Sequence, residues 1–361
     1  MSADDASSHG DPVDVVTSHA TVRITSPDKV FFPAIGATKR DLVRYYQAVE
    51  APALAALGGR PTMMERYPDG AGAKSFFQKR VPAGAPPWLQ TTIVSTPNGT
   101  ESNAMVIADL AHLLWAVNIG CLGFHPWPYL AAAPHRTDEL RLDLDPQPGV
   151  TFAMVQEAAA EVKLLLDAHS VVSFPKTTGN RGIHIYVRLL PIQNSFAVRS
   201  MAVAIARALE QRRPDLITAA WWKEERGQRV FVDFNQNAPH KTVFGAWAVR
   251  PRVGGQVSTP FAWDELDSID PEALTLLVVP ERVQKLGNPW ATMNDHPQDP
   301  SPLNDMVAAD TAAGLPDAPW PPVYPKMPNE PSRVAPSRAK KPVAPKKGQD
   351  AGEPTSTETG P

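Results

Sequence analysis

The sequence predicts an α/β fold of the α+β kind, with a central β-sheet flanked by helices. Three features of the middle of the chain indicate it: an alternating strand with paired acids, a helical run behind it, and a further succession of strands and helices. Apolar residues at every second position predict a strand, and recurrence at every third and fourth position predicts a helix. The strands are expected over residues 141–146, 171–174, 182–189 and 229–234, and the helices over residues 151–169 and 195–213.

A smaller N-terminal unit is expected before this core. Residues 1–19 are polar and small and predict a disordered arm, so order is expected to begin at residues 20–25, "ATVRIT". Thr38, followed three positions later by Asp41, predicts a capping box that opens a helix over residues 39–57. That helix is expected to close the unit.

The sequence after the core predicts an ordered part and then a tail. A strand is expected over residues 242–250 and a helical turn over residues 264–269. From residue 294 onward proline is dense and apolar periodicity ends, so residues 294–361 are expected to form a largely disordered basic tail. Its lysines either attract nucleic acid weakly or are only solvated charges at the end of a linker.

Composition limits the class of protein. The 361 residues are 43% hydrophobic with a formal net charge of −3, which favours a globular protein without an overall basic field. A single cysteine, Cys121, excludes an internal disulfide and a cysteine-cluster metal site. The N-terminus does not resemble a secretory signal, and polar residues interrupt the most apolar stretch, residues 104–124. We therefore expect no membrane span and a cytoplasmic location.

The stretch "RLDLDP" places two acids inside an apolar strand. Leu142 and Leu144 alternate with Asp143 and Asp145, so a strand that buries both leucines points both carboxylates to its other face. Neighbouring carboxylates repel and raise each other's pKa unless a cation or several hydrogen-bond donors lie between them. The strand therefore predicts a compensating group at this face.

A third acid, Asp233, lies in the later strand "RVFVDF". If the two strands are neighbours, three carboxylates converge, and such a group binds two hard divalent cations about 3.5–4 Å apart. Phosphoryl transfer uses that arrangement. In the structural alternative, Asp143 and Asp145 only end a strand before Pro146, and Asp233 pairs with an arginine.

A short basic turn follows in "KTTGNRGIHIYV". Gly179 and Gly182 bracket it, so its backbone can approach a phosphate group without obstruction by a Cβ atom. Thr178 offers a hydroxyl and Arg181 a planar fork of donors. His184 taken alone is more often a core histidine than a ligand contact, and the same holds for His125 in "GFHPWP".

Taken together and in order, these motifs resemble the polymerase domain of bacterial ligase D, a member of the archaeo-eukaryotic primase superfamily. The resemblance covers most of the chain, and residues 20–293 are interpreted as such a domain in a stand-alone primase-polymerase form. No KxDG-like ligase signature is present in the sequence. The matching segments are "SPDKVFFPAIGATKRDLVRYY", "ERYPDG", "KSFFQKR", "DLDP", "TTGNRGIHIYV" and "VDFNQNAPHKTVFGAWAVRPRVGGQVSTPFAWDEL".

The resemblance implies a role for each matched residue. The implied ligands of two Mg²⁺ or Mn²⁺ ions at a palm-like sheet are Asp143, Asp145 and Asp233. The residues implied at the incoming nucleotide, the first four of them on its triphosphate, are Thr178, Arg181, His184, Arg250, His125 and Gln236. The residues implied at the DNA are Lys29 and Lys39 on a downstream 5′-phosphate, Phe77 stacked on the template, and Arg226 close by.

Several of the DNA positions have a structural alternative. Lys29 and Lys39 are equally interpretable as solvated surface charges, and Phe76 and Phe77 as core residues. At Glu65 the sequence departs from the lysine or arginine that often precedes "RYPDG" in the family. That departure puts a negative charge beside the implied DNA path and weakens the expected grip on the template.

The implied reaction is template-directed transfer of a nucleotide onto a 3′-hydroxyl with release of pyrophosphate. By resemblance we expect short gaps or broken ends to be filled, with ribonucleotides favoured, and primer synthesis as a further activity. The implied substrates are gapped or broken double-stranded DNA with a 5′-phosphate and nucleoside triphosphates, either NTP or dNTP. The implied partners are a separate DNA ligase and a Ku-type end binder, and the implied location is the bacterial nucleoid.

Two other functions remain open from the residues alone. Three carboxylates with two cations also activate water, as in a metal-dependent nuclease or phosphoesterase. Alternatively, the acids are structural and the chain is a noncatalytic DNA-end-binding module. Only the polymerase hypothesis gives the basic turn a triphosphate to bind.

Overall fold

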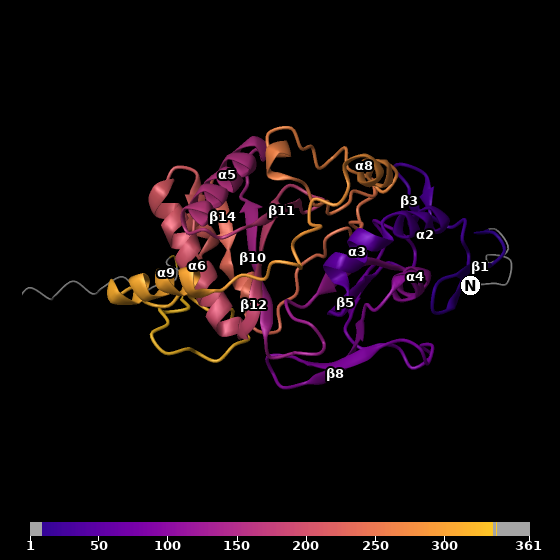
Figure 1. Ribbon diagram of the computed structural model, residues 1–361, viewed down its shortest axis with the longest axis horizontal. Helices are drawn as coiled ribbons and strands as arrows, with labels where there is room; N and C mark the ends of the chain where they lie inside the picture. Colours follow the sequence, from indigo (N-terminus) through magenta and orange to yellow (C-terminus); the bar gives the residue numbers. More distant parts are fainter. Residues whose placement is uncertain (1–8, 335–336, 338–361) are drawn as a thin grey trace, which may run out of the picture.

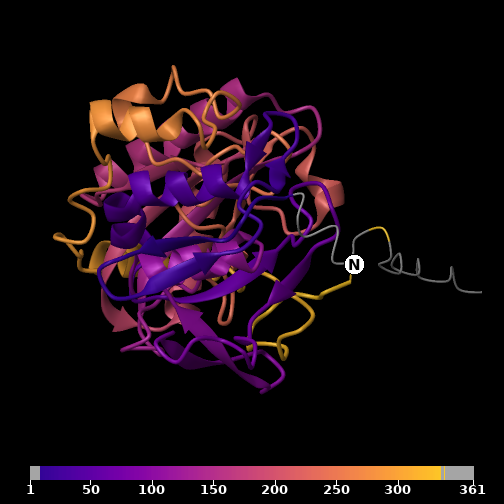
Figure 2. The same ribbon diagram turned by 90° about the vertical axis from the view of Figure 1, so that its right-hand side faces the viewer.

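The computed structural model describes residues 9–334 and 337, arranged as two regions side by side (Figure 1). One region is a sheet with its covering helices, and the other is built mainly from residues 9–126, with a later helical segment beside it (Figures 1 and 2). The predicted disorder of residues 1–8, 335–336 and 338–361 lies outside the described residues. The mixed α/β class predicted from the sequence is confirmed.

The central sheet has the strand order β11-β12-β10-β14-β13. Its pairs are antiparallel except for β13 and β14, which run parallel. Its strands are β10 (Thr137–Pro146), β11 (Phe174–Thr177), β12 (Ile183–Gln193), β13 (Ile217–Thr218) and β14 (Val230–Asp233). The two acidic strands, β10 and β14, are therefore neighbours, as the convergence of the three carboxylates requires.

Two long helices cover one face of this sheet (Figure 1). Helix α5 (Phe152–Ala168) begins after Thr151, and α6 (Ser195–Arg212) begins after Asn194, whose side chain accepts from the third backbone N–H. Leu142 and Leu144 of β10 are fully buried. Because side chains alternate along a strand, their burial leaves the acids of β10 on the opposite face. Both predicted helices are confirmed.

The N-terminal region contains a second sheet around β5 (Pro61–Arg66). Two small hairpins precede it, and helices pack beside it (Figure 2). Its other strands are β6 (Phe76–Gln78), β7 (Thr91–Ser95), β8 (Glu101–Val106) and β9 (Cys121–Pro126). The hairpins are β1 (Val13–Val16) with β2 (Thr21–Ile24) and β3 (Val30–Phe32) with β4 (Ala37–Thr38). The helices are α2 (Lys39–Ala48), α3 (Glu50–Leu57) and α4 (Leu110–Asn118).

The predicted disordered arm and the single helix over residues 39–57 both need correction. Residues 13–16 form β1, because their backbone groups pair with β2. The capping box of Thr38 and Asp41 is present and opens α2. The helix is then interrupted at Val49, because Pro52 lacks an N–H and is tolerated only in the first turn of a helix, which starts again as α3.

Two strand predictions were also imprecise. Strand β11 lies over Phe174–Thr177 and not over residues 171–174, because the Gln298 side chain bonds the backbone N–H and carbonyl of Val172. Residues 242–250 form no strand, because their backbone donors bond to different segments, among them the carbonyls of Phe124 and Ser258. The helical turn near residues 264–269 is the short 3₁₀ helix η3 (Trp263–Glu265).

The predicted tail is structured up to residue 334. Residues 301–312 form α9 (Ser301–Ala312), which packs against α6. Further on, Trp320 and Tyr324 are 3% and 6% exposed. Proline prevents regular helix and strand here but does not prevent aromatic side chains from packing. The remaining helices of the described chain are α7 (Lys223–Arg226), η2 (Phe234–Asn237) and α8 (Val279–Leu286), and none of the helices described is long and apolar enough to cross a membrane.

A buried ionic cluster joins the two regions. Arg60 donates to both carboxylate oxygens of Asp138 at 2.8 and 2.7 Å and lies 3.0 Å from Glu139. Glu139 also contacts Arg141 and Arg188 of the central sheet at 2.5 and 3.1 Å. Burial alone would raise the pKa of Glu139, but the three guanidinium groups outweigh it and lower that pKa to about 2.

Removing the charge of Glu139 therefore leaves three buried guanidinium groups short of a partner. We expect Glu139→Gln to lower the free energy of unfolding by about 3–5 kcal/mol, as measured by urea titration. The matched control is Glu157→Gln, whose half-exposed carboxylate pairs with Arg213 and contributes about 0–1 kcal/mol. Equal losses in both variants would contradict a structural role for the cluster.

Candidate active site

One row of residues crosses the central sheet and gathers its polar side chains. Lys176 of β11 lies opposite His184 of β12, which lies opposite Asp143 of β10, which lies opposite Asp233 of β14. Residues opposite one another on neighbouring strands point to the same face of a sheet. Register therefore brings together four residues that lie up to 90 positions apart in the chain.

Short polar contacts link three members of this row, directly or through Gln236. His184 Nε2 lies 3.2 Å from Asp143 Oδ1. The Gln236 amide donates to Asp233 Oδ2 at 2.9 Å and reaches Asp143 Oδ2 at 3.5 Å. The carboxylates of Asp143 and Asp233 thus converge on one donor, which confirms that the two acidic strands point their side chains toward each other.

The three carboxylates are poorly compensated for their charge. Burial raises the pKa of Asp143 to about 6. Burial and then the Asp143 carboxylate raise the pKa of Asp233 to about 6, and the same two causes raise the pKa of Asp145. When burial and a neighbouring carboxylate raise the pKa of an acid, a bound cation stabilises its ionised form. Such a cluster therefore favours cation binding.

The basic members of the row are buried with the acids. Burial lowers the pKa of both His184 and Lys176 well below their usual values, so burial opposes a positive charge on either group. Among the described residues, His184 Nδ1 is buried without a hydrogen-bond partner. Lys176 Nζ instead bonds Ser258 Oγ at 2.5 Å. The Nδ1 atom of His184 is therefore available to hydrogen-bond a ligand that binds beside the acids.

The acids fit hard divalent cations in their chemistry, although they are not arranged as ligands. Within residues 9–334 and 337, no group of three or more His, Cys, Asp or Glu side chains could hold a metal ion as it stands. Gln236 lies between two of the acids, and Asp145 turns toward the Gln147 amide at 3.2 Å. Carboxylate oxygens are the ligands that Mg²⁺ and Mn²⁺ prefer, so Asp143, Asp145 and Asp233 are the residues that would hold such ions.

The glycine-bracketed turn borders the same space. A pocket of about 130 Å³ is lined by Asp143, Asp145, Thr178, Arg181, His184 and Arg250, six of the residues predicted for metal or nucleotide. Gly179 has a φ of +69°, and a Cβ there would lie 2.7 Å from Arg250 Cγ, so glycine is required. The Thr178 hydroxyl accepts from the N–H groups of Asn180 and Gly182, both at 3.2 Å, and thereby closes the turn itself.

A stack of rings connects this pocket to the second sheet. Arg250 lies 3.7 Å above the centre of the Phe244 ring, and its Nε donates to the Thr178 carbonyl oxygen at 2.6 Å. Phe244 meets His125 edge-on at 5.2 Å, and His125 meets Phe77 edge-on at 5.5 Å. Arg250 and His125 are therefore brought to one wall of the site.

Glu65 belongs to this wall. Its carboxylate lies 3.1 Å from His125 Nε2 and accepts from the Tyr67 hydroxyl at 2.8 Å. Burial would raise the pKa of Glu65, but the hydrogen bonds from His125 and Tyr67 outweigh it and lower the pKa. The Glu65 carboxylate, whose charge we expected beside the DNA path, therefore bonds to His125 and Tyr67.

Two of the predicted DNA residues are available at the surface. Phe77 is 59% and Phe76 46% exposed, so the structural alternative of core residues is wrong for both. Lys29 Nζ bonds Asp69 Oδ1 and the Pro68 carbonyl, each at 2.9 Å, in the "RYPDG" loop. Its partner Asp69 is mostly exposed, so this pair can exchange for a phosphate group.

Lys39 and Arg226, the other two residues predicted at the DNA, are buried, so the alternative of a solvated surface charge is wrong for Lys39. Lys39 is 5% exposed, and its ammonium donates to the carbonyl oxygens of Thr25 and Asn118 at 2.6 and 3.1 Å. Arg226 is 6% exposed and lies 3.5 Å from the centre of the Phe231 ring. Both cations are held inside the protein because nearby carbonyl or aromatic groups satisfy them, so neither presents a free charge to DNA here.

Lys176 is the site residue that the sequence reasoning missed. It is the third residue of β11 and lies opposite His184, so its place in the row depends on the pairing of β11 with β12. That pairing is not visible in "KTTGN" itself, whose predicted turn begins at Thr178.

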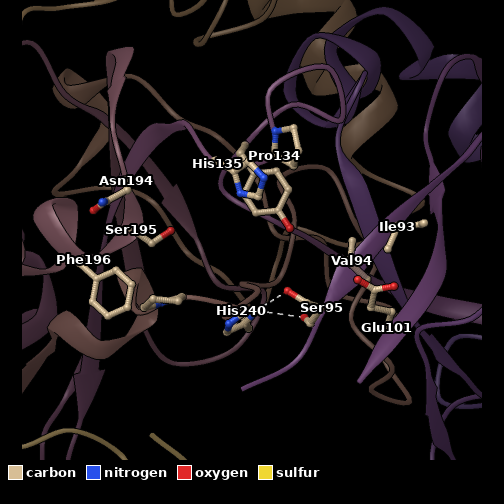
Figure 3. Close-up of a pocket in the computed structure, with 12 residues that line it drawn as sticks. Ile93, Val94, Ser95, Glu101, Pro134, His135, Asn194, Ser195, Phe196 and His240 are labelled. Atoms are coloured by element: carbon tan, nitrogen blue, oxygen red, sulfur yellow. Dashed lines mark hydrogen bonds between the residues drawn. The ribbon is translucent and has the colours of Figure 1, made fainter. Parts of the chain in front are cut away.

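A larger cavity lies away from the acidic row. Its volume is about 590 Å³, and it lies between the hairpin of β7 and β8, the start of α6 and the loop at His240 (Figure 3). His240 Nδ1 bonds the Ser95 carbonyl oxygen at 3.0 Å on its wall. None of the residues in the acidic row lines this cavity.

A row of carboxylates on a sheet, beside a basic glycine-bracketed turn, is an arrangement that suits enzymes of phosphoryl transfer. Residues 38–290 match the family model for the LigD primase-polymerase domain. The chain therefore belongs to this family and is a nucleotidyltransferase.

The relatives that match are considerably longer proteins. The "Multifunctional non-homologous end joining protein LigD" of Mycobacterium bovis is 35% identical over 258 residues, which are 69% of this chain and 34% of the relative. The "Bifunctional non-homologous end joining protein LigD" of Bacillus subtilis is 33% identical over 301 residues, 83% of this chain and 47% of the relative. The chain thus spans about a third to a half of these relatives.

A solved structure matches the fold as well. The polymerase domain of Mycobacterium tuberculosis ligase D, solved in complex with DNA, superposes with a TM-score of 0.71 and 31% sequence identity. The match covers 77% of this chain and 99% of that domain. Nearly the whole of that polymerase domain therefore has a counterpart here.

The burial of Lys39 predicts a pH dependence of stability. Its pKa falls to about 8 in the folded protein because of burial and of nearby Lys29, against an ordinary value of 10.5. Between these two values the unfolded chain holds a proton that the folded protein lacks, so stability rises with pH by up to about 1.4 kcal/mol per unit. Below about pH 8 this contribution is constant.

Lys39→Met isolates the effect. Urea unfolding of both proteins at pH 7 and pH 9.5 should show that the wild type gains stability relative to the variant at the higher pH. A difference between the two proteins that does not change with pH would mean that Lys39 is not buried in its charged form at neutral pH.

Proposed function

We propose that this chain transfers nucleotides from nucleoside triphosphates onto the 3′-hydroxyl of a DNA strand under template direction. The 3′ oxygen attacks the α-phosphorus, the bond to the bridging oxygen breaks, and pyrophosphate leaves. The observation that carries the proposal is the acidic row beside the glycine-bracketed basic turn, in a chain of the LigD primase-polymerase family. The matched solved domain binds DNA, which supports DNA as the polymer.

Asp143, Asp145 and Asp233 are proposed to hold two Mg²⁺ or Mn²⁺ ions. Such ions lower the pKa of the attacking hydroxyl and neutralise charge on the leaving group. The protein's own contribution is to hold the acids at fixed register positions on a rigid sheet. Their raised pKa supports the proposal, because a cation relieves the cost of ionising them together.

The basic turn and the ring stack are proposed to bind the nucleotide. Arg181 and Arg250 line the pocket beside the acids and suit the triphosphate oxygens. His184 adds its unpartnered ring nitrogen, and Thr178 keeps the turn closed. His125 and the exposed Phe77 are suited to the base and template side, because aromatic faces stack on nucleobases.

The biological setting proposed is the filling of short gaps or ends during repair of broken DNA, with ribonucleotides favoured. The names of the relatives place them in non-homologous end joining. A separate DNA ligase and a Ku-type end binder are the proposed partners, since sealing and end-bridging need chemistry that this domain does not show. Lys29 is the proposed contact for a downstream 5′-phosphate.

The acidic row gives the first test. Asp143→Asn and Asp233→Asn should each reduce extension of a labelled primer on a gapped template at least about 100-fold, because metal ligands supply several kcal/mol to the transition state. DNA binding should change little, since metal ligands position the chemistry more than they hold the DNA backbone. Asp215→Asn, an exposed acid paired with Arg213, is the matched control and should extend normally.

Product length decides between this function and its alternatives. A polymerase lengthens the primer, a nuclease shortens it, and a noncatalytic end-binding module leaves it unchanged. Full extension by either acidic variant would remove the acidic row from the mechanism.

Arg250 gives the second test. Arg250→Ala should raise the KM for the nucleoside triphosphate about 10- to 100-fold, because a hydrogen bond to a charged group contributes about 1.5–3 kcal/mol. Steady-state extension at varied nucleotide concentration measures it. The control, Arg212→Ala, removes a partly exposed guanidinium at the end of α6 that pairs with Glu161. An unchanged KM in Arg250→Ala would exclude a triphosphate contact.

A further inference from the structure

Residues 317–333, here called the strap, pack beside the loop that carries Asp233. The strap lies beyond the residues 38–290 that match the family. Trp320 and Tyr324 of the strap are almost fully buried and form a small apolar cluster with Ala238, close behind η2. The Tyr324 hydroxyl donates to the carbonyl oxygen of Pro239. The strap therefore fixes the C-terminal end of the η2 loop from outside.

Arg199 of α6 joins the strap to the core. It is fully buried, and its guanidinium donates to Asp317 Oδ1 and to the carbonyl oxygens of Ala318 and Pro319, all at 3.0 Å. The Trp320 ring covers the same guanidinium at 3.9 Å. Asp317 in turn accepts from the Trp320 indole at 2.7 Å. Removing the strap would leave a buried cation without most of its partners.

The remaining donor of Arg199 points toward the acidic row. Its Nε donates to Asn235 Oδ1 at 2.7 Å. The backbone N–H of Asn235 donates to Asp233 Oδ1 at 3.0 Å. A continuous set of hydrogen bonds therefore runs from the strap through Arg199 and Asn235 to one carboxylate oxygen of the row.

The η2 loop is also held from its other side. Asn237 Nδ2 donates to the Arg141 carbonyl oxygen at 2.7 Å, and Asn237 Oδ1 accepts from the Arg141 N–H at 2.8 Å. These bonds fix the loop to β10. The loop is thus clamped between a strand of the central sheet and the strap, and only the strap side lies outside the matched family domain.

We propose that the strap is part of the metal-binding apparatus, with Arg199 as the positioning residue that aligns Asp233 for a divalent cation. The inference deepens the proposed function and rests on it for the identity of the cation. Groups that orient a metal ligand through hydrogen bonds commonly change metal affinity about 10- to 100-fold when they are removed. The strap acts through two intermediate residues, so the lower end of that range is expected.

Direct Mn²⁺ binding to the full chain tests the inference without relying on activity. Free Mn²⁺ is followed by electron paramagnetic resonance during titration of the wild type, Trp320→Ala and Asp317→Asn. The matched control is Arg207→Gln, also on α6, which loses contacts to Asp310 and the Pro316 carbonyl but touches no residue of η2. Trp320→Phe, which keeps a ring over Arg199, serves as the conservative variant.

We expect Trp320→Ala and Asp317→Asn to weaken Mn²⁺ binding roughly tenfold, with Trp320→Phe close to the wild type. Arg207→Gln should bind Mn²⁺ normally even where its Tm falls by a similar amount. Mn²⁺ affinities in both strap variants equal to that of Arg207→Gln would show that the strap is only structural and overturn the proposal. If Trp320→Ala does not fold, Asp317→Asn decides the matter alone.

The two proposals fail in different ways. Wild-type protein that binds Mn²⁺ tightly but extends no primer would overturn the proposed function and leave the role of the strap standing. Primer extension by the wild type, with strap variants that keep full Mn²⁺ affinity, would overturn the strap inference alone.

Discussion

The register of β10 against its two neighbours determines where every acidic group of the site lies. Asp143 is opposite His184 on one side and Asp233 on the other. With this pairing, acids that are far apart in the chain share one face of a rigid sheet, and their pKa values rise because of burial and mutual repulsion. The glycine-bracketed turn, the Gln236 amide and the rings of Phe244 and His125 all lie around the acids that this register brings together.

Much of this arrangement could be predicted from the sequence. Alternation in "RLDLDP" placed both acids on the face opposite the leucines, and the resemblance to a known family added Asp233 as their neighbour. The conformational demand at Gly179 was also visible, because a basic turn bracketed by glycines seldom tolerates a side chain. These features depend on local pattern, and local pattern can be read from one sequence.

Other features depend on contacts that no local pattern shows. Lys39 was expected either at the DNA, from the family resemblance, or as a solvated surface charge, yet two carbonyl oxygens from distant segments hold its ammonium inside the protein. Residues 294–361 were expected to be disordered because proline is dense. The Trp320 ring nevertheless packs against the Arg199 guanidinium of α6. The acids themselves lie on one side of a protein whose two regions are joined by the buried cluster around Glu139.

Polar residues alternate along positions 139–145 of β10: Glu139, Arg141, Asp143 and Asp145 share one face, while Leu140, Leu142 and Leu144 fill the other. A shift of one position would exchange the two sets and push four charges against the helices. Mispaired forms of this strand are therefore strongly disfavoured during folding. The charged face of β10, which holds both the structural cluster and the acidic row, therefore also favours a single alignment of the central strands.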